Sequence, residues 1–532
     1  MKKKKNKTKL SHEILTLVTT FSFHTHTKLE LQEFLLVIDK RDTYNNMENE
    51  IMKEPLLEKK YYKDCPGCKV DQAKELKKGA SVLNLLIIWM LMICASLPIS
   101  CLYPFLYFMV KDFNVAKTEA DISTYAGYVG STLMLGRALT SVGWGLFSDR
   151  YGRKPALIVG VMSVIIFNTL FGLSTNFWMA IITRFLLGCG NGIIGPVKAY
   201  ATELFREEDQ AIGLSTVSAA WAIGLIIGPA LGGYLAQPVM KYPHIFPKGS
   251  FWDKFPYFLP CFIISGLAFP VLIACIWIPE TLHNHKGGNE CTDEAEALEN
   301  GSNRVNKGKT TQKNENLLKN WPLMSSIIVY CIFSLHDMAY TEVFSLWAVS
   351  PPSLGGLNFT TDNVGNVLAI SGLLLIIYQL ILYPYVERAC GPIRISRITG
   401  MLSIPLLQSY PFIAMLSGVT LYIVISLASI LKNILSMTII TGLFILQNRA
   451  VKQNQRGAAN GISVTCVSLF KAIGPAVGGA LLTWSQKRMH ASFLPGTHMI
   501  FFIMNLVEGL GLLMMFKPFL NDEKNTHSDQ LH

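Results

Sequence analysis

The sequence predicts an all-α integral membrane protein with twelve transmembrane helices arranged as two six-helix bundles. Of its 532 residues, 50% are hydrophobic and only 16% are charged, whereas soluble domains are about a quarter charged. Apolar runs of about 20 residues, long enough for a helix to cross the hydrocarbon core, recur along the chain. Segments of the first half also return in the second half in the same order. This predicts parallel repeats, two bundles related by an axis along the membrane normal.

The first 80 residues contain no convincing span, and we expect a cytosolic N-terminal segment there. Residues 1–46 are predicted to be a disordered extension, because the weak apolar stretch at 14–23 has no clear cleavage site for a signal peptide. Cys65 and Cys68 flank a Pro-Gly turn and could share a soft metal ion or form a disulfide. Two thiols supply only half of the ligands that zinc takes, so a structural turn is the alternative.

Hydropathy divides the remaining chain into an N-terminal bundle (81–278), a polar central linker (279–320), a C-terminal bundle (321–518) and a tail (519–532). The linker is rich in Asn and Lys and has no apolar period, so we expect cytosolic disorder. The twelve spans are predicted at 82–110, 122–143, 156–174, 176–197, 211–236, 257–278, 322–349, 361–386, 394–415, 418–446, 458–483 and 498–517.

A charged loop is predicted between spans two and three, at 144–155. It carries three cations against one carboxylate, and the loops at 387–397 and 447–456 are also basic. The loop at 203–210 is assigned to the same side. The positive-inside rule places these loops, and with an even number of spans both termini, in the cytosol. We expect Asp149 and Arg153 to hold the helix ends together in one conformation and to release them in the other. The residues of this predicted gate are Gly145, Asp149, Arg150, Gly152, Arg153 and Lys154.

Span five contains glycines at helical spacing, which make a groove for close helix contact, and a proline that permits a bend. The motif recurs in span eleven as Gly474-Pro475 and Gly478-Gly479, and Glu387-Arg388 after span eight is a degraded echo of the charged loop. A packing motif with no bearing on transport direction is the alternative reading. Its residues in span five are Ser215, Gly224, Gly228, Pro229, Gly232 and Gly233.

Ionisable residues inside spans are expensive and are functional candidates. His336 and Asp337 share an arc of span seven and are predicted to carry a proton or to bind substrate, or else to form a buried structural pair. Glu342 points away from His336 and is assigned to a different contact. Arg137 is expected to snorkel to the surface, and Glu508 has no obvious partner. The full candidate set is His336, Asp337, Glu342, Arg184, Lys432 and Lys471, with Cys65, Cys68, His283 and His285 as weak metal ligands.

Three motifs resemble known transporters. The loop Trp144–Lys154 is similar to the motif after the second helix of the major facilitator superfamily, and span five resembles its antiporter signature. Cys65-Pro66-Gly67-Cys68 and Pro279-Glu280-Thr281-Leu282-His283 resemble the plant zinc-induced-facilitator-like transporters, over about residues 47–517. The resemblance implies the major facilitator fold and proton-coupled export from the cytosol. It also implies nicotianamine or related phytosiderophores as cargo, with links to zinc and iron homeostasis, potassium and auxin.

We therefore expect a proton-coupled antiporter that exports a small organic metal chelator across the vacuolar or plasma membrane. The alternatives are a transporter of another solute (potassium, auxin, sugar or drug) and a metal-sensing receptor that resembles a transporter. Its expected partners are the lipid bilayer, a small-molecule substrate and protons, and it is expected to act as a monomer. No nucleophile–base constellation or cofactor motif indicates an enzyme. The clustering of cations in short loops argues against nucleic acid as a partner.

Overall fold

The computed structural model describes residues 65–76, 82–205, 210–282, 317–451 and 456–520, and within these ranges it contains helices and no strand. Contacts divide the chain into residues 1–61, none of which is described, and residues 62–532, which contain every described element. The predicted extension at 1–46, the linker residues 283–316 with His283 and His285, and the tail residues 521–532 lie outside the described residues.

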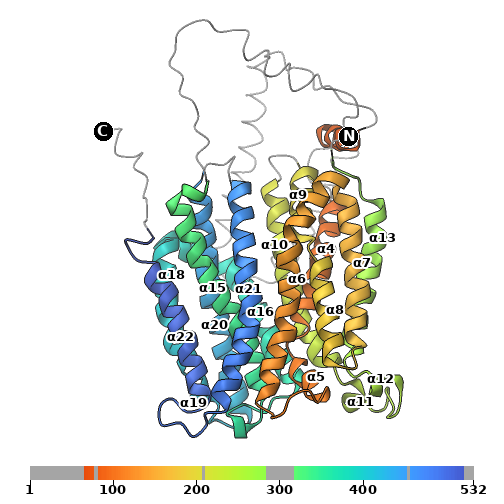
Figure 1. Cartoon of the computed structure of the whole chain (residues 1–532). Helices are drawn as coiled ribbons and strands as arrows, with labels where there is room; N and C mark the ends of the chain where they lie inside the picture. Colours follow the sequence, from red (N-terminus) through yellow and green to blue (C-terminus); the bar gives the residue numbers. More distant parts are fainter. Residues whose placement is uncertain (1–64, 77–81, 206–209, 283–316, 452–455, 521–532) are drawn as a thin grey trace, which may run out of the picture. The chain divides into compact units, whose positions relative to one another are not determined.

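The helices of the first half (red to yellow-green in Figure 1) pack mainly on one another. They are α3 (Pro66–Leu76), α4 (Val82–Ser100), α5 (Leu106–Asp112), α6 (Asp121–Tyr151), α7 (Arg153–Gly172), α8 (Phe177–Gly190), α9 (Ile194–Leu204), α10 (Gln210–Leu235), α11 (Pro238–Lys241), α12 (Phe251–Lys254) and α13 (Phe258–Trp277).

The helices of the second half (green to blue in Figure 1) form a second group. They are α15 (Trp321–Val349), α16 (Thr361–Ile377), the π-helical turn Tyr378–Leu382, α17 (Tyr383–Cys390), α18 (Pro392–Gln408), α19 (Tyr410–Ile413), α20 (Gly418–Arg449), α21 (Arg456–Gln486) and α22 (Thr497–Met514), preceded or joined by 3₁₀ turns at Leu317–Lys319 and Pro352–Leu354.

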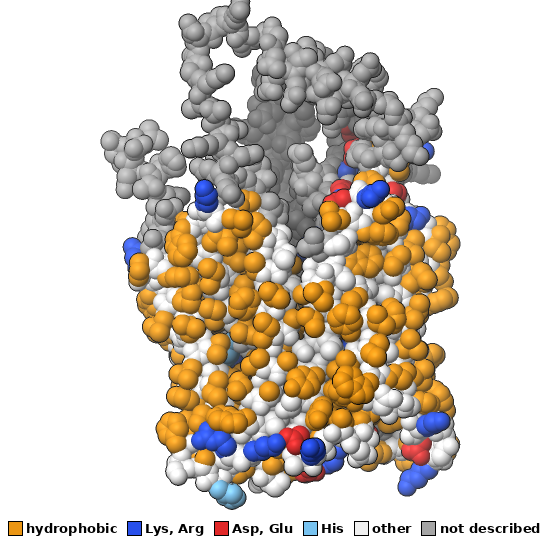
Figure 2. Space-filling model, in the orientation of Figure 1, with side chains coloured by type: hydrophobic (Ala, Val, Ile, Leu, Met, Phe, Trp, Pro, Cys, Tyr) orange, Lys and Arg blue, Asp and Glu red, His pale blue; other side chains and the backbone are white. Residues whose placement is uncertain are grey.

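Each of the twelve predicted spans falls on one of these helices or on consecutive helices. Among the described residues, eight helical segments are long and apolar enough by length and composition to cross a membrane. Hydrophobic side chains cover the middle of the face shown in Figure 2, and its described charged side chains lie toward the two ends. The predicted all-α membrane fold is confirmed.

The first span is shorter than predicted. The sequence predicts an uninterrupted span over 82–110, but α4 ends at Ser100 and a new helix begins at Leu106. Pro104 explains the break, because proline has no N–H to donate and disfavours helical backbone in the residue before it.

The charged motif after the second span is also different from the prediction. It was expected as a loop at 144–155, yet α6 continues as a helix through Tyr151 and α7 starts at Arg153. Only Gly152 leaves helical geometry, with φ at +110°, a region that favours glycine. Gly391, with φ at +77°, makes the same break between α17 and α18. The motif repeated at Glu387-Arg388 therefore also has the same backbone geometry in the second half.

The two halves are joined at one end, which we call the joined end (the lower end in Figure 1). It contains the starts of α6 and α16 and the ends of α10 and α21. Thr124 Oγ1 donates to Thr483 Oγ1 at 2.7 Å, and Lys241 lies 3.5 Å from the Asp362 carboxylate. Hydrogen bonds and ion pairs between described residues of the two halves join these helix ends. We call the opposite end, around Gly152 and Gly391, the basic end.

Candidate functional site

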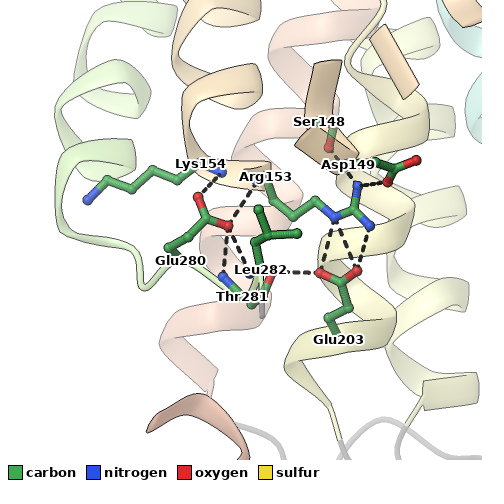
Figure 3. A network of polar contacts seen from close by, with 8 residues as sticks. All are labelled: Ser148, Asp149, Arg153, Lys154, Glu203, Glu280, Thr281 and Leu282. Atoms are coloured by element: carbon green, nitrogen blue, oxygen red, sulfur yellow. Dashed lines mark hydrogen bonds and ion pairs between the residues drawn. The ribbon is translucent and has the colours of Figure 1, made fainter. Parts of the chain in front are cut away.

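Arg153, the first residue of α7, binds side chains from α6 and α9 at the basic end (Figure 3). Its Nη2 and Nε donate to Oε1 of Glu203 at 2.7 and 3.1 Å. Its Nη1 donates to Ser148 Oγ at 2.9 Å and to the carboxylate of Asp149. A guanidinium shared by two carboxylates fixes the three helix ends relative to one another. The predicted Asp149–Arg153 contact is present, whereas Glu203 was not foreseen as its second acceptor.

Glu280 closes the same network from the residues after α13. Its carboxylate accepts from the backbone N–H groups of Arg153 and Lys154 at 2.9 and 3.0 Å, so it caps the start of α7. Unpaired N–H groups and the helix dipole make a helix start a favourable place for a carboxylate. Pro279–Leu282 was predicted as the beginning of a disordered linker. Its place is instead fixed, because Thr281 Oγ1 also donates to Glu203 Oε2 at 2.6 Å.

The other residues of the predicted gate take different places. A β-carbon at Gly152 would come within 2.8 Å of Glu280 Cδ, so close approach requires glycine there. Gly145 has open space around it, so no close approach requires glycine at this position. Arg150 is exposed with its guanidinium 5.6 Å from the Tyr151 ring centroid, and Lys154 Nζ donates to Ile276 O at 2.5 Å.

The cysteine motif docks on this network through its backbone. Gly67 N–H, in the first turn of α3, donates to Leu282 O at 3.3 Å, and both Cys65 and Cys68 are buried. Among the described residues, no group of three or more His, Cys, Asp or Glu side chains could hold a metal ion. His283 and His285 lie outside the described residues, so metal binding by the combined set stays a prediction.

Two buried charged residues from opposite halves interact electrostatically inside the helices. Arg184 of α8 is 2% exposed, and its Nη1 donates to Pro98 O of α4 at 2.8 Å. Glu342 of α15 is fully buried and interacts electrostatically with Arg184, but neither of its carboxylate oxygens has a hydrogen-bond partner in the structure. Tyr103 completes this group by its electrostatic contact with both. Neither Tyr103 nor its role could be read from its isolated place in the sequence.

A second polar group lies inside the second half. His336 Nε2 is 3.6 Å from Glu508 Oε2 of α22, and Ser403 Oγ of α18 donates to the other oxygen of that carboxylate. Lys432 of α20 is fully buried, with Nζ 4.5 Å from the ring centroid of Tyr340. Glu508, which has no obvious partner in the sequence, therefore has two.

Asp337 takes part in a different contact from His336, although the residues are adjacent. Its Oδ1 accepts from Ser436 Oγ of α20 at 2.6 Å, and Lys471 of α21 is close enough to interact electrostatically. The structure thus divides the predicted His336–Asp337 pair between two neighbouring polar groups.

The prediction that Arg137 snorkels to the surface is wrong. Arg137 is 8% exposed, and its Nε donates at 3.3 Å to Asn191 O, at the break between α8 and α9. Its guanidinium also lies 5.3 Å from the Trp221 ring centroid. The break in span four, which was predicted as continuous over 176–197, supplies the carbonyl that keeps this arginine inside.

The glycine motif of α10 has two packing faces. A β-carbon at Gly224, Gly228 or Gly232 would collide with Ser96, Ser100 or Cys101 of the first span, whereas one at Gly233 would lie 2.9 Å from Gly365 Cα of α16. In the same way, Gly478 of α21 packs against α15 of its own half, and Gly479 packs against α6 of the other half. The predicted groove for close helix contact is confirmed in both halves. Ser215 lies in the part of α10 whose side chains are not described.

Comparison with known proteins agrees with this arrangement. The family model described as Major Facilitator Superfamily matches residues 88–450. The chain is 58% identical over 469 residues to Protein ZINC INDUCED FACILITATOR-LIKE 1 of Arabidopsis thaliana, covering 88% of this chain and 98% of that protein. It is 56% identical over 480 residues to Protein ZINC INDUCED FACILITATOR 1 of the same plant, covering 89% and 99%. The crystal structure of a D-xylose–proton symporter superposes with a TM-score of 0.61 at 13% identity, covering 83% of this chain and 98% of that one.

Proposed function

This chain belongs to the major facilitator superfamily and, within it, to the zinc-induced facilitators, and on that premise we propose a specific transport activity. The protein exports a small anionic or zwitterionic organic metal chelator, such as nicotianamine, from the cytosol in exchange for protons. The names of its relatives support a solute connected with zinc, and the buried charges of the helices support an organic ion.

The observation that carries the proposal is the burial of Arg184 and Glu342, which come from opposite halves and interact electrostatically. Charges deep inside spans are retained at a cost and mark substrate or ion pathways. Arg184 can bind a substrate carboxylate bidentately, and Lys432 and Lys471 are further cations for a chelator with several carboxylates. Exchange with protons needs carboxylates or imidazoles in the same region, for which Asp337, Glu342 and His336 are the candidates.

The sidedness follows from the charges of the loops. The basic end faces the cytosol under the positive-inside rule, and the joined end then faces the vacuole or the cell exterior. In this state the contacts between the halves lie at the far side, which supports a conformation that opens toward the cytosol. The protein acts as a monomer in the vacuolar or plasma membrane, with both termini in the cytosol.

The proton gradient supplies enough free energy for this exchange. One pH unit is worth about 1.4 kcal/mol per proton, so a gradient of about two units supports roughly hundredfold accumulation for one-to-one exchange.

The experiment is uptake of labelled nicotianamine into inside-out vesicles, with and without an acidic interior. We expect uptake to require the gradient. Arg184→Gln should lower it at least tenfold, because the loss of a charge-assisted bidentate contact costs about 1.5–3 kcal/mol. Arg394→Gln, at an exposed arginine of α18, is the matched control and should keep the wild-type rate.

Two results would revise the proposal. Gradient-driven uptake that survives Arg184→Gln would keep the activity and move the carboxylate site elsewhere. Absence of uptake with either gradient would remove nicotianamine, and potassium, auxin and zinc would then be assayed in that order.

A further inference from the structure

The Glu342 carboxyl group lies in apolar surroundings that do not suit an ionised group. It is fully buried in α15, next to the core residues Val343 and Phe344, and both of its oxygens lack hydrogen-bond partners. Burying an ionised carboxylate without hydrogen bonds costs several kcal/mol, and the usual response is to take up a proton.

The surface that faces this carboxyl group belongs to the other half. A β-carbon at Gly130 of α6 would lie 2.9 Å from each carboxylate oxygen and 3.1 Å from Cδ. Glu342 therefore occupies the space that the absent side chain of Gly130 leaves. Val129, the residue before it, is fully buried and belongs to the same hydrophobic core as Val343 and Phe344.

The charged and titratable groups around Glu342 form no hydrogen bond with its carboxylate in the structure. Arg184 of α8 interacts with it electrostatically, but that guanidinium donates to Pro98 O and lies 5.0 Å from the Phe171 ring centroid. Tyr103, between α4 and α5, is the other titratable neighbour that interacts with Glu342, and Asp337 on α15 itself adds a second carboxylate near Tyr103. Asp337 in turn faces Ser436 and Lys471.

The contact is next to the place where the halves join. Gly127, one turn before Gly130, packs against Pro475 O and lies 3.2 Å, measured from its ideal β-carbon, from Gly479 Cα of α21. A change that pushes α6 away from α15 at Gly130 would therefore also act on the α6–α21 crossing. Protonation of Glu342 and closure of the joined end therefore both depend on the position of α6.

We propose that Glu342 carries the coupled proton, and that only its protonated form packs against Gly130 when the joined end is closed. The proposal rests on the proton exchange proposed above and assigns it to one contact. The carboxylate takes a proton from the far side when that side is open, and the neutral acid then allows α6 to approach. Release of this proton to the cytosol leaves an ionised, unpartnered group, which favours separation of the halves at the joined end.

Infrared difference spectroscopy of the full-length protein in lipid tests this directly. A carboxylic acid C=O band should appear on acidification and be lost in Glu342→Gln, which is isosteric and neutral. The same band should remain in Glu508→Gln and Asp337→Asn. Persistence of the band in Glu342→Gln would overturn the assignment, whether or not nicotianamine is the substrate.

The contact itself is tested by Gly130→Ala. The added β-carbon opposes the closed, protonated contact, so the band should titrate at lower pH than in the wild type. Gly143→Ala, on the same helix with nothing within 4 Å of its β-carbon, is the matched control and should titrate as the wild type does. An unchanged titration in Gly130→Ala would show that protonation of Glu342 does not depend on its packing against Gly130, and the proposed coupling would be wrong.

Transport gives an independent readout. In Glu342→Gln, gradient-driven accumulation should fall from about a hundredfold to about onefold at a difference of two pH units, while substrate counterflow continues. Accumulation that stays near the wild-type level would refute the proposal. If the wild type itself moves no nicotianamine, the proposed substrate fails, and the two infrared tests still decide the role of Glu342.

Discussion

The Glu280 carboxylate accepts hydrogen bonds from four backbone N–H groups, those of Arg153, Lys154, Thr281 and Leu282, and thereby fixes both the start of α7 and the segment after α13. We expect Glu280→Gln to lower stability by about 1–2 kcal/mol, because the amide loses the charge and presents N–H donors to N–H donors. The midpoint of thermal unfolding in detergent measures this change.

Glu387→Gln is the control for that variant. Glu387 belongs to the echo of the motif, where it pairs with an Arg449 side chain that is 60% exposed. Exposed ion pairs contribute at most about 1 kcal/mol, so this midpoint should move little. Equal shifts in the two variants would show that Glu280 acts only as a surface charge.

Ser403 donates to the buried Glu508 carboxylate, which faces His336 on its other side. Ser403→Ala should destabilise the second half by about 1–3 kcal/mol, since it leaves a buried acceptor unsatisfied. Thr399→Val, one turn earlier on α18, removes a hydroxyl that bonds only to the carbonyls of its own helix, and it should cost much less. Thermal unfolding of both variants distinguishes the two cases, and similar losses would contradict a specific Ser403–Glu508 bond.

The sequence predicts which residues are candidates but not which of them meet. Asp149 and Arg153 lie four residues apart near a helix boundary, and their contact could be expected. Glu508 and His336 are separated by most of the second half, and Glu342 and Gly130 lie in different halves. No local pattern reports such contacts. Arg137 is an instructive error, because its burial depends on a break in another helix that hydropathy does not reveal.

At the scale of elements, the membrane makes helix positions predictable, since each span needs a long apolar segment. Hydropathy does not show where the helix breaks within such a segment. It merged α4 with α5 across Pro104 and α8 with α9 across Asn191, and it ended span two before the charged but helical turn that precedes Gly152. Proline and glycine were the available signals, and they report breaks more reliably than charge does here.

The crossing of α10 and α16 depends on Gly233 and Gly365. A β-carbon at Gly233 would lie 2.8 Å from Thr361 O and 2.9 Å from Gly365 Cα. Gly233→Ala should therefore weaken this contact by about 1–3 kcal/mol, as overpacking does elsewhere. Hydrogen exchange at the start of α16 should become faster by about fivefold to a hundredfold.

Gly266→Ala in α13 is the control, because its β-carbon would have nothing within 4 Å. The exchange of α16 should not change in this variant. If Gly233→Ala also leaves it unchanged, the crossing does not limit the opening of the joined end.

For the whole molecule, the two crossings are equivalent under the internal repeat. Gly479 meets Ser123 O and Gly127 Cα in the way that Gly233 meets Thr361 O and Gly365 Cα. Each half thus offers one helix start and one helix end to the other. If the two halves rock about this repeat, the contacts at the joined end would break while new contacts form between the halves at the basic end. The network around Arg153 and Glu280 lies within the first half and would not need to break in this motion.

The joined end is held by close helix packing at glycines and by an ion pair, and the two contributions can be measured separately. Lys487 pairs with Asp121 across the halves, but its side chain is 51% exposed, so salt screens the pair and we expect a contribution of at most about 1 kcal/mol. Lys487→Gln should therefore speed hydrogen exchange at the start of α6 by no more than about fivefold at low salt, and high salt should remove the difference. Gly479→Ala, whose β-carbon would lie 3.0 Å from Gly127 Cα, should speed exchange by about tenfold or more at any salt concentration. A larger and salt-sensitive effect of Lys487→Gln would mean that charge, rather than the glycine crossings, controls this end of the protein.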